Sequence, residues 1–160
     1  MEGSETEVRL ATFSGQQELA WITQVLRQEL AEPYSVFTYY YFLKNWPHLT
    51  IIAYLQQQPI GCIIGSIDQQ NPHKAYIAML VVLKEYRRHK VGKKLFDEFV
   101  ARVRPTVDKI VLETECINKA ALSFYLRLGF FKTRKMSNYY LSGNDAFRLK
   151  LYLKKTDRLR

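Results

Sequence analysis

The chain has few cysteines and few histidines. Its 160 residues include only two cysteines, Cys62 and Cys116, each in an apolar setting. A disulfide scaffold needs more cysteines than this, so we expect buried free thiols, as in a cytoplasmic protein. The three histidines, His48, His73 and His89, share no metal-ligand spacing, and no metal site is expected.

Other absences narrow the class of protein further. There is no run of 18 or more apolar residues, so we expect no membrane-spanning helix. Residues 1–7 are acidic and polar, unlike a secretory signal, and we expect them to be flexible. Acidic residues are also scarce, with 15 Asp and Glu against 24 Lys and Arg, which gives a net charge of +9. This charge suggests an anionic partner, and it does not choose between a phosphorylated cofactor, RNA and an acidic subunit.

The remaining composition suits one α/β domain. Hydrophobic residues make up 48% of the chain, which is ample for one core. We expect this domain at residues 8–153, followed by a basic tail at residues 154–160. Hydrophobic periodicity predicts strands at residues 8–13, 49–55, 60–68, 75–82, 109–115, 130–136 and 146–153. Four helices are predicted, one from a capping-type start at residues 14–18, then residues 36–45, 91–104 and 118–128. This order predicts a sheet of about seven strands with helices on both faces.

A short basic loop at residues 86–94 joins a predicted buried strand to an amphipathic helix. A helix start presents unpaired N–H groups and positive potential, so it binds phosphate readily. Gly92 allows another group to approach the backbone closely. The loop therefore predicts a pyrophosphate cradle, and the alternative is a solvated basic turn. The residues that add positive charge are Arg87, Arg88, Lys90, Lys93 and Lys94.

Two segments resemble the Gcn5-related N-acetyltransferase (GNAT) superfamily, which binds acetyl-CoA. The loop Arg87-Arg88-His89-Lys90-Val91-Gly92 is similar to the pattern Arg/Gln-x-x-Gly-x-Gly/Ala, with Lys90 in place of the first glycine. A non-glycine residue still donates its N–H if φ stays negative, so we expect Lys90 to be tolerated. Residues 118–130 are similar to the pattern N-x-x-A-x-x-x-Y-x-x-x-G-F, with Asn118 and Tyr125 at its polar positions.

The superfamily resemblance implies a GNAT fold, a mixed twisted sheet with splayed central strands. It implies acetyl-CoA as co-substrate and no metal. It also implies that the Tyr125 hydroxyl protonates the leaving thiolate, and the alternative is a hydrogen-bonded core tyrosine. The residues implied to bind the cofactor are Leu80, Val82, Arg87, Arg88, His89, Lys90, Val91, Gly92, Lys93, Asn118 and Tyr125.

Further segments resemble the catalytic subunits of NatC-type N-terminal acetyltransferases (Mak3-like). These segments are residues 32–35, 76–80, 112–115, 138–141 and 145–149. The resemblance implies that Glu113 is the base and Tyr76 a second catalytic tyrosine. The alternatives are a carboxylate paired with a nearby Lys or Arg, and ordinary packing on a strand. Glu115 points to the same face as Glu113 and could share its role. The oxyanion needs a backbone donor, for which Leu80 is the best candidate.

The same resemblance implies a groove for an extended peptide. Tyr139 and Tyr140 would form one side of it, with Glu32 and Tyr34 opposite; the alternative for the tyrosine pair is an edge-strand position. The implied function is acetyl transfer to the α-amine of protein N-termini that begin with Met and a bulky hydrophobic residue. The rivals are a GNAT enzyme for a small amine or lysine side chain, and a non-catalytic CoA-fold subunit.

The resemblance also implies partners. Nascent-peptide N-termini would be the substrates. One large and one small Sm-like auxiliary subunit would bind the chain and connect it to the ribosome. The expected location is the cytoplasm, with no membrane partner. The basic C-terminal residues suggest a solvated tail, with ribosomal RNA contact as the alternative.

Overall fold

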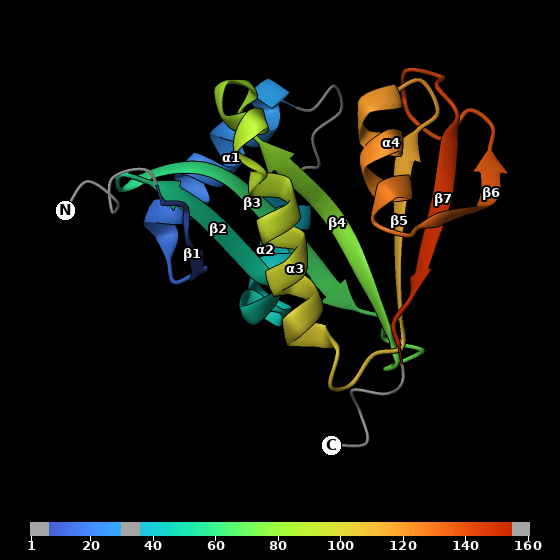
Figure 1. Ribbon diagram of the computed structural model, residues 1–160, viewed down its shortest axis with the longest axis horizontal. Helices are drawn as coiled ribbons and strands as arrows, with labels where there is room; N and C mark the ends of the chain where they lie inside the picture. The colour runs from blue at the N-terminus through green and yellow to red at the C-terminus, as the bar shows by residue number, and fades with distance from the viewer. Residues whose placement is uncertain (1–6, 30–35, 155–160) are drawn as a thin grey trace. The chain divides into compact units, whose positions relative to one another are not determined.

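The computed structural model describes residues 7–29 and 36–154, whose elements follow the predicted order (Figure 1). The strands are β1 Arg9–Thr12, β2 Thr50–Leu55, β3 Gln58–Ile67, β4 Lys74–Val82, β5 Lys109–Glu115, β6 Phe131–Met136 and β7 Ala146–Tyr152. The α-helices are α1 Gln16–Glu29, α2 Val36–Asn45, α3 Val91–Val103 and α4 Lys119–Arg127, with 3₁₀ helices η1 Pro47–Leu49 and η2 Lys84–His89. No helix within the described residues is both long enough and apolar enough to cross a bilayer.

The strands form a sheet in the order β1-β2-β3-β4-β5-β7-β6. Pairing is parallel between β4 and β5 and antiparallel between β1 and β2, β2 and β3, β5 and β7, and β6 and β7. The prediction of a mixed seven-stranded α/β sheet is therefore confirmed. The chain divides into two compact units, residues 1–66 with 79–102, and residues 67–78 with 103–160, so β4 contributes to both.

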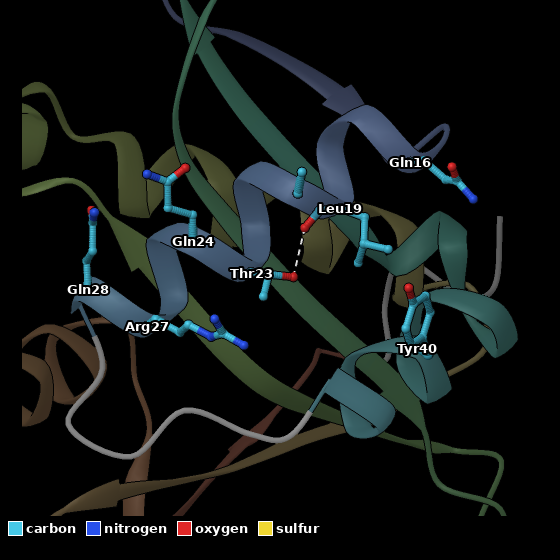
Figure 2. A pocket seen from close by; sticks show the side chains of 8 residues that line it. Gln16, Leu19, Thr23, Gln24, Arg27, Gln28 and Tyr40 are labelled. Carbon is cyan, nitrogen blue, oxygen red and sulfur yellow. Dashed lines mark hydrogen bonds between the residues drawn. The ribbon is translucent and has the colours of Figure 1, made fainter.

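The first unit packs three helices on strands β1 to β3 and the end of β4. Every residue of β3 from Ile60 to Ser66 is buried, which requires cover on both faces. The cover comes from α3 on one face and from α1 and α2 on the other (Figures 1 and 2). At the start of α1 the Glu18 carboxylate accepts hydrogen bonds from Ser14 Oγ and Gly15 N, each at 2.7 Å. The predicted capping at this start is confirmed.

Helix α2 buries only part of its aromatic set. Tyr39 and Phe42 are buried in the core, whereas Phe37, Tyr40 and Tyr41 are exposed. One helix presents one inward stripe, so consecutive rings must diverge. Phe37, at 83% exposure, is the most exposed ring of this helix among its described side chains.

The second unit contains β5, β6, β7, the first part of β4 and α4. Helix α4 begins where predicted, because Asn118 Oδ1 accepts the N–H of Ala121 at 3.1 Å. It stops before Gly129, whose φ of 106° suits glycine. Beyond Gly129, Phe130 is buried and β6 is exposed along most of its length. Helix α4 therefore packs on the core through the face that carries Tyr125, and the turn after the helix packs through Phe130.

The basic loop differs from its prediction. Most of it is the 3₁₀ helix η2, and Lys90 links η2 to α3 in the left-handed conformation, with φ 57° and ψ 29°. The expectation of a negative φ at Lys90 is wrong. Lys90 is the single residue between η2 and α3, and the chain changes direction there through a left-handed conformation. Glycine, which the superfamily pattern has at this position, adopts that conformation freely.

A substitution series tests this strain. We expect Lys90→Gly to leave the free energy of unfolding unchanged or to raise it by up to about 1 kcal/mol, because it removes the steric cost of positive φ. Lys90→Val should lower it by about 1–2 kcal/mol, since a β-branched residue is disfavoured there. Urea unfolding would measure both.

The control for this series is Lys94, which has a helical backbone. There Lys94→Gly should lower the free energy of unfolding by about 1 kcal/mol. An equal loss for glycine at position 90 and position 94 would contradict strain at Lys90.

Candidate active site

The start of α3 has the geometry of an anion site. The hydrogen bond from Lys94 N to Lys90 O, at 3.1 Å, is the first of the helix. The N–H groups of Val91, Gly92 and Lys93 therefore precede the helical ladder. They lie at the positive end of the helix dipole, where phosphate binds. This start fits the predicted pyrophosphate cradle.

Two of the predicted cradle cations already have acidic neighbours. Arg87 Nη2 lies 2.8 Å from Glu29 Oε2, and its Nε donates to Val82 O at 3.1 Å. Lys93 Nζ lies 2.6 Å from Asp97 Oδ2. Exposed ion pairs of this kind contribute at most about 1 kcal/mol, so either cation can change partner at little cost. The other exposed side chains among the described residues of the predicted cradle are His89, Lys90 and Lys94.

Leu80 and Val82 lie at the end of β4. They are half-buried, and they alternate with the buried residues Met79 and Val81. This end of β4 lies close to β3, because a Cβ on Gly61 would come within 2.8 Å of Val81 O. The close approach of β3 to β4 fixes the end of β4, which carries Leu80 and Val82.

Glu113 is the most buried carboxylate among the described ion pairs. Its side chain is 9% exposed, and Oε1 accepts from Arg148 Nη2 at 3.1 Å. Its other oxygen, Oε2, is buried and has no hydrogen-bond partner within the described part of the chain. Glu113 is thus paired with an arginine, as the alternative reading expected. It also keeps one acceptor oxygen unused, and a catalytic role is one explanation for a buried polar atom that is left unpaired.

Glu115 has a different partner. Its Oε2 accepts a hydrogen bond from Asn144 Nδ2 at 3.0 Å. One residue on, Cys116 N donates to Asp145 O at 2.9 Å. These bonds attach the connection between β6 and β7 to the end of β5. Glu115 therefore supports this connection.

Tyr139 and Tyr140 lie on that connection, as predicted. Their rings meet edge-on at 5.1 Å between centroids, and Tyr139 is 47% exposed. Tyr140 N donates to Asn144 O at 3.2 Å, and Asn138 N donates to Asp145 Oδ1 at 2.9 Å. The pair is not part of either strand, so the edge-strand alternative does not describe it.

Tyr125 is buried on α4. Its ring contacts Phe124 and Phe130 edge-on, with centroids 5.3 Å and 5.5 Å away. Burial raises the pKa of the Tyr125 hydroxyl well above its ordinary value. The hydroxyl therefore carries its proton at neutral pH, as a tyrosine with its ordinary pKa also would. Asn118, seven residues earlier, is exposed and caps the same helix.

Tyr76 lies half-buried on β4 and pairs with Val111 in the parallel register. Paired residues share a face of the sheet, and so does Glu113, two residues beyond Val111. Three predicted site features lie outside the described residues, namely Glu32, Tyr34 and the side chain of Arg88.

Arg148 is the residue that the sequence reasoning did not single out. It follows from the register of β5 with β7, which places Arg148 directly opposite Glu113. The pair lines a pocket of about 460 Å³ in the second unit. Within residues 7–29 and 36–154, no three His, Cys, Asp or Glu side chains gather as a metal site would need.

A separate groove in the first unit contains none of the predicted site residues. Figure 2 shows it between α1 and Tyr40 of α2, with a volume of about 670 Å³. Its lining combines apolar surface, to which Leu19, Ala20 and the Tyr40 ring contribute, with polar side chains, and Thr23 Oγ1 donates to Leu19 O at 2.9 Å. The exposed rings of α2 belong to the same unit.

Known proteins match the chain over most of its length. The model of the acetyltransferase (GNAT) family matches residues 17–130. N-alpha-acetyltransferase MAK3 of Arabidopsis thaliana is 39% identical over 156 residues, which cover 96% of this chain and 82% of the relative. N-alpha-acetyltransferase 30 of Homo sapiens is 37% identical over 155 residues, which cover 95% of this chain and 43% of the human protein. The chain thus spans less than half the length of that human relative.

Solved structures agree with these relatives. A chain in a crystal structure of the NatC complex bound to Gag peptide and CoA superposes with a TM-score of 0.85 and 38% identity, over 92% of this chain and 99% of that chain. Ard1 of Thermoplasma volcanium, at a TM-score of 0.86 and 23% identity, shares the fold. The family resemblance predicted from the two motif segments is confirmed: the chain belongs to the GNAT acetyltransferase family, among the relatives of N-alpha-acetyltransferase MAK3.

Proposed function

We propose that the chain transfers the acetyl group of acetyl-CoA to the α-amine of protein N-termini that begin with Met and a bulky hydrophobic residue. The relatives named N-alpha-acetyltransferase support the reaction, and the likeness to a chain of a NatC complex that was crystallised with Gag peptide and CoA supports a peptide substrate. The observation that carries the proposal is the buried Glu113 carboxylate with its unused Oε2.

Two residues of the second unit have complementary roles in this reaction. The amine must lose a proton before it attacks the thioester, and Glu113 accepts that proton directly or through one water. The CoA thiolate leaves as the amide forms, and it takes up a proton. Tyr125 donates it, since a tyrosine hydroxyl carries its proton at neutral pH. Tyr76 lies on the same face of the sheet as Glu113 and assists it in deprotonating the amine.

The chain's own groups fit the pyrophosphate of acetyl-CoA. The first-turn N–H groups of α3 bind it, and exposed basic side chains nearby offset its charge. Leu80 supplies the backbone N–H for the oxyanion, and Leu80 and Val82 hold the pantetheine arm along β4. Asn118, which also caps the start of α4, contributes to acetyl-CoA binding.

The peptide is held by the connection between β6 and β7. Tyr139 and Tyr140 bond its backbone and offer ring surface to its apolar side chains. Glu32 and Tyr34 complete the site in the proposal. A lysine or small-amine substrate is the second candidate, and it would make no use of the tyrosine pair.

Auxiliary subunits of the NatC type are the proposed partners, and through them the ribosome. The likeness to a chain of the NatC complex supports this. The exposed rings of α2 and the neighbouring groove of Figure 2 offer apolar and polar contact area for such a subunit.

The cradle is tested at Gly92. We expect Gly92→Asp to raise the acetyl-CoA dissociation constant at least about tenfold, because it places a negative charge beside the phosphates. An aspartate in the first turn favours the helix itself, so the loss would not come from unfolding. Gly92→Ala is the matched control, with added volume and no charge. Unchanged affinity of the aspartate variant in calorimetric titration would rule out the cradle.

The base is tested with a panel of Met-x peptides, plus lysine-only and polyamine controls. Wild type should acetylate Met-Leu and related peptides and leave both controls untouched. Glu113→Gln should lower kcat by about 10² or more at unchanged acetyl-CoA affinity, since the amide cannot take up the proton.

Glu115→Gln provides the matched control for this variant, because it keeps a hydrogen-bond acceptor for Asn144. We expect kcat of this control within about threefold of wild type. A low kcat in Glu115→Gln with a normal kcat in Glu113→Gln would assign the base to Glu115. Acetylation of the lysine-only peptide would favour a lysine or small-amine substrate.

The peptide groove is tested by removing two hydroxyls. The double variant Tyr139→Phe and Tyr140→Phe should raise the Met-Leu peptide KM about five- to a hundredfold, because each lost hydrogen bond costs about 0.5–1.5 kcal/mol. Acetyl-CoA affinity should not change. Tyr152→Phe, which removes a hydroxyl from an exposed ring on β7, is the control. Wild-type KM in the double variant would exclude the pair from peptide binding.

A further inference from the structure

Arg148 reaches Glu113 from the neighbouring strand with two donors. Its Nη2 lies 3.1 Å and its Nε 3.4 Å from the same oxygen, Glu113 Oε1. On the other side, Thr133 Oγ1 of β6 donates to Arg148 O at 3.2 Å. Arg148 is therefore held from both adjacent strands while its guanidinium contacts the carboxylate.

Other cations line the pocket around this pair without the same contact. They are Lys74, Arg134 and Lys150. Lys74 pairs with Asp68 at 3.4 Å. Among the described lining residues, Arg148 is the cation in contact with Glu113. The interaction is thus particular to one side chain and is more than a general basic field.

The contact makes the two oxygens of Glu113 different. Oε1 is occupied by the guanidinium, and Oε2 is buried and has no partner within residues 7–29 and 36–154. We propose that Arg148 is a positioning residue for Glu113, which holds the carboxylate by Oε1 and leaves Oε2 to receive the proton of the substrate amine. This inference rests on the proposed function, in which Glu113 is the base.

The step balances with these groups alone. The ammonium N–H bond breaks, its electron pair stays on nitrogen, and the proton passes to Oε2 directly or through one water. The neutral amine then attacks the thioester. The guanidinium offsets the negative charge of a carboxylate that is largely removed from water. It has no acceptor site of its own, so it does not compete for the proton.

Steady-state kinetics on a Met-Leu peptide test the assignment. We expect Arg148→Met to lower kcat about 10- to 100-fold, with peptide KM and acetyl-CoA affinity within about twofold of wild type. Arg148→Lys keeps the charge and should restore kcat to within about tenfold of wild type. Arg134→Met removes a cation opposite Arg148 on β6 and should leave kcat near wild type. An equal loss in that control would show a general field effect and overturn the proposal.

A double-mutant cycle separates positioning from other roles. If Arg148 acts through Glu113, the variant with both Glu113→Gln and Arg148→Met should have the same kcat as Glu113→Gln alone. This variant carries no uncompensated charge, so it folds even if Arg148→Met alone is unstable, as urea unfolding would report.

The outcomes of the cycle are distinct. Wild-type kcat in Glu113→Gln would overturn the proposed base, and with it this inference. A low kcat in Glu113→Gln together with wild-type kcat in Arg148→Met, or with losses that multiply in the double variant, would overturn the positioning role alone.

Discussion

The antiparallel ladder between β5 and β7 determines where the groups of the second unit lie. It pairs the two strands without interruption from Lys109 with Tyr152 to Glu115 with Ala146. Directly opposite residues share a face, so this register sets Glu113 beside Arg148. A slip of one residue would turn every side chain over and move Glu113 into the apolar layer under α4.

The apolar face of the same ladder stabilises that register. Ile110, Leu112 and Leu149 are almost fully buried there, and burial of each such side chain contributes about 1.5–3 kcal/mol. A buried ion pair contributes little net stability by itself, because desolvation offsets the attraction. The apolar residues therefore hold the strands in place, and the charged pair on the opposite face is positioned as a consequence. This division explains why a partly desolvated carboxylate is tolerated on β5.

Sequence predicted the elements whose signals are local. Asn118 and Gly129 bound α4, and the residues that cap α1 lie within four positions of one another. The fold was predicted from hydrophobic periodicity together with the family resemblance, and Glu113 was singled out by the resemblance alone. Two features depend on the path of the folded chain instead. The left-handed turn at Lys90 follows from the junction of η2 with α3. Arg148 lies 35 positions from Glu113, and no local signal distinguishes it from the other cations of its pocket.

Tyr125 and Glu113 have surroundings that suit different roles in the proposed reaction, Tyr125 as a proton donor and Glu113 as a proton acceptor. A reaction that takes a proton from an amine and gives one to a thiolate needs a group that starts unprotonated and another that starts protonated. Burial among apolar rings raises the pKa of the Tyr125 hydroxyl, and the guanidinium of Arg148 offsets the charge of Glu113. Helix α4 packs on the face that carries Leu151, since a Cβ on Gly129 would come within 3.2 Å of that side chain, whereas Glu113 is on the opposite face. In the proposed reaction, the proton acceptor Glu113 and the proton donor Tyr125 would therefore reach the thioester from opposite faces of the sheet.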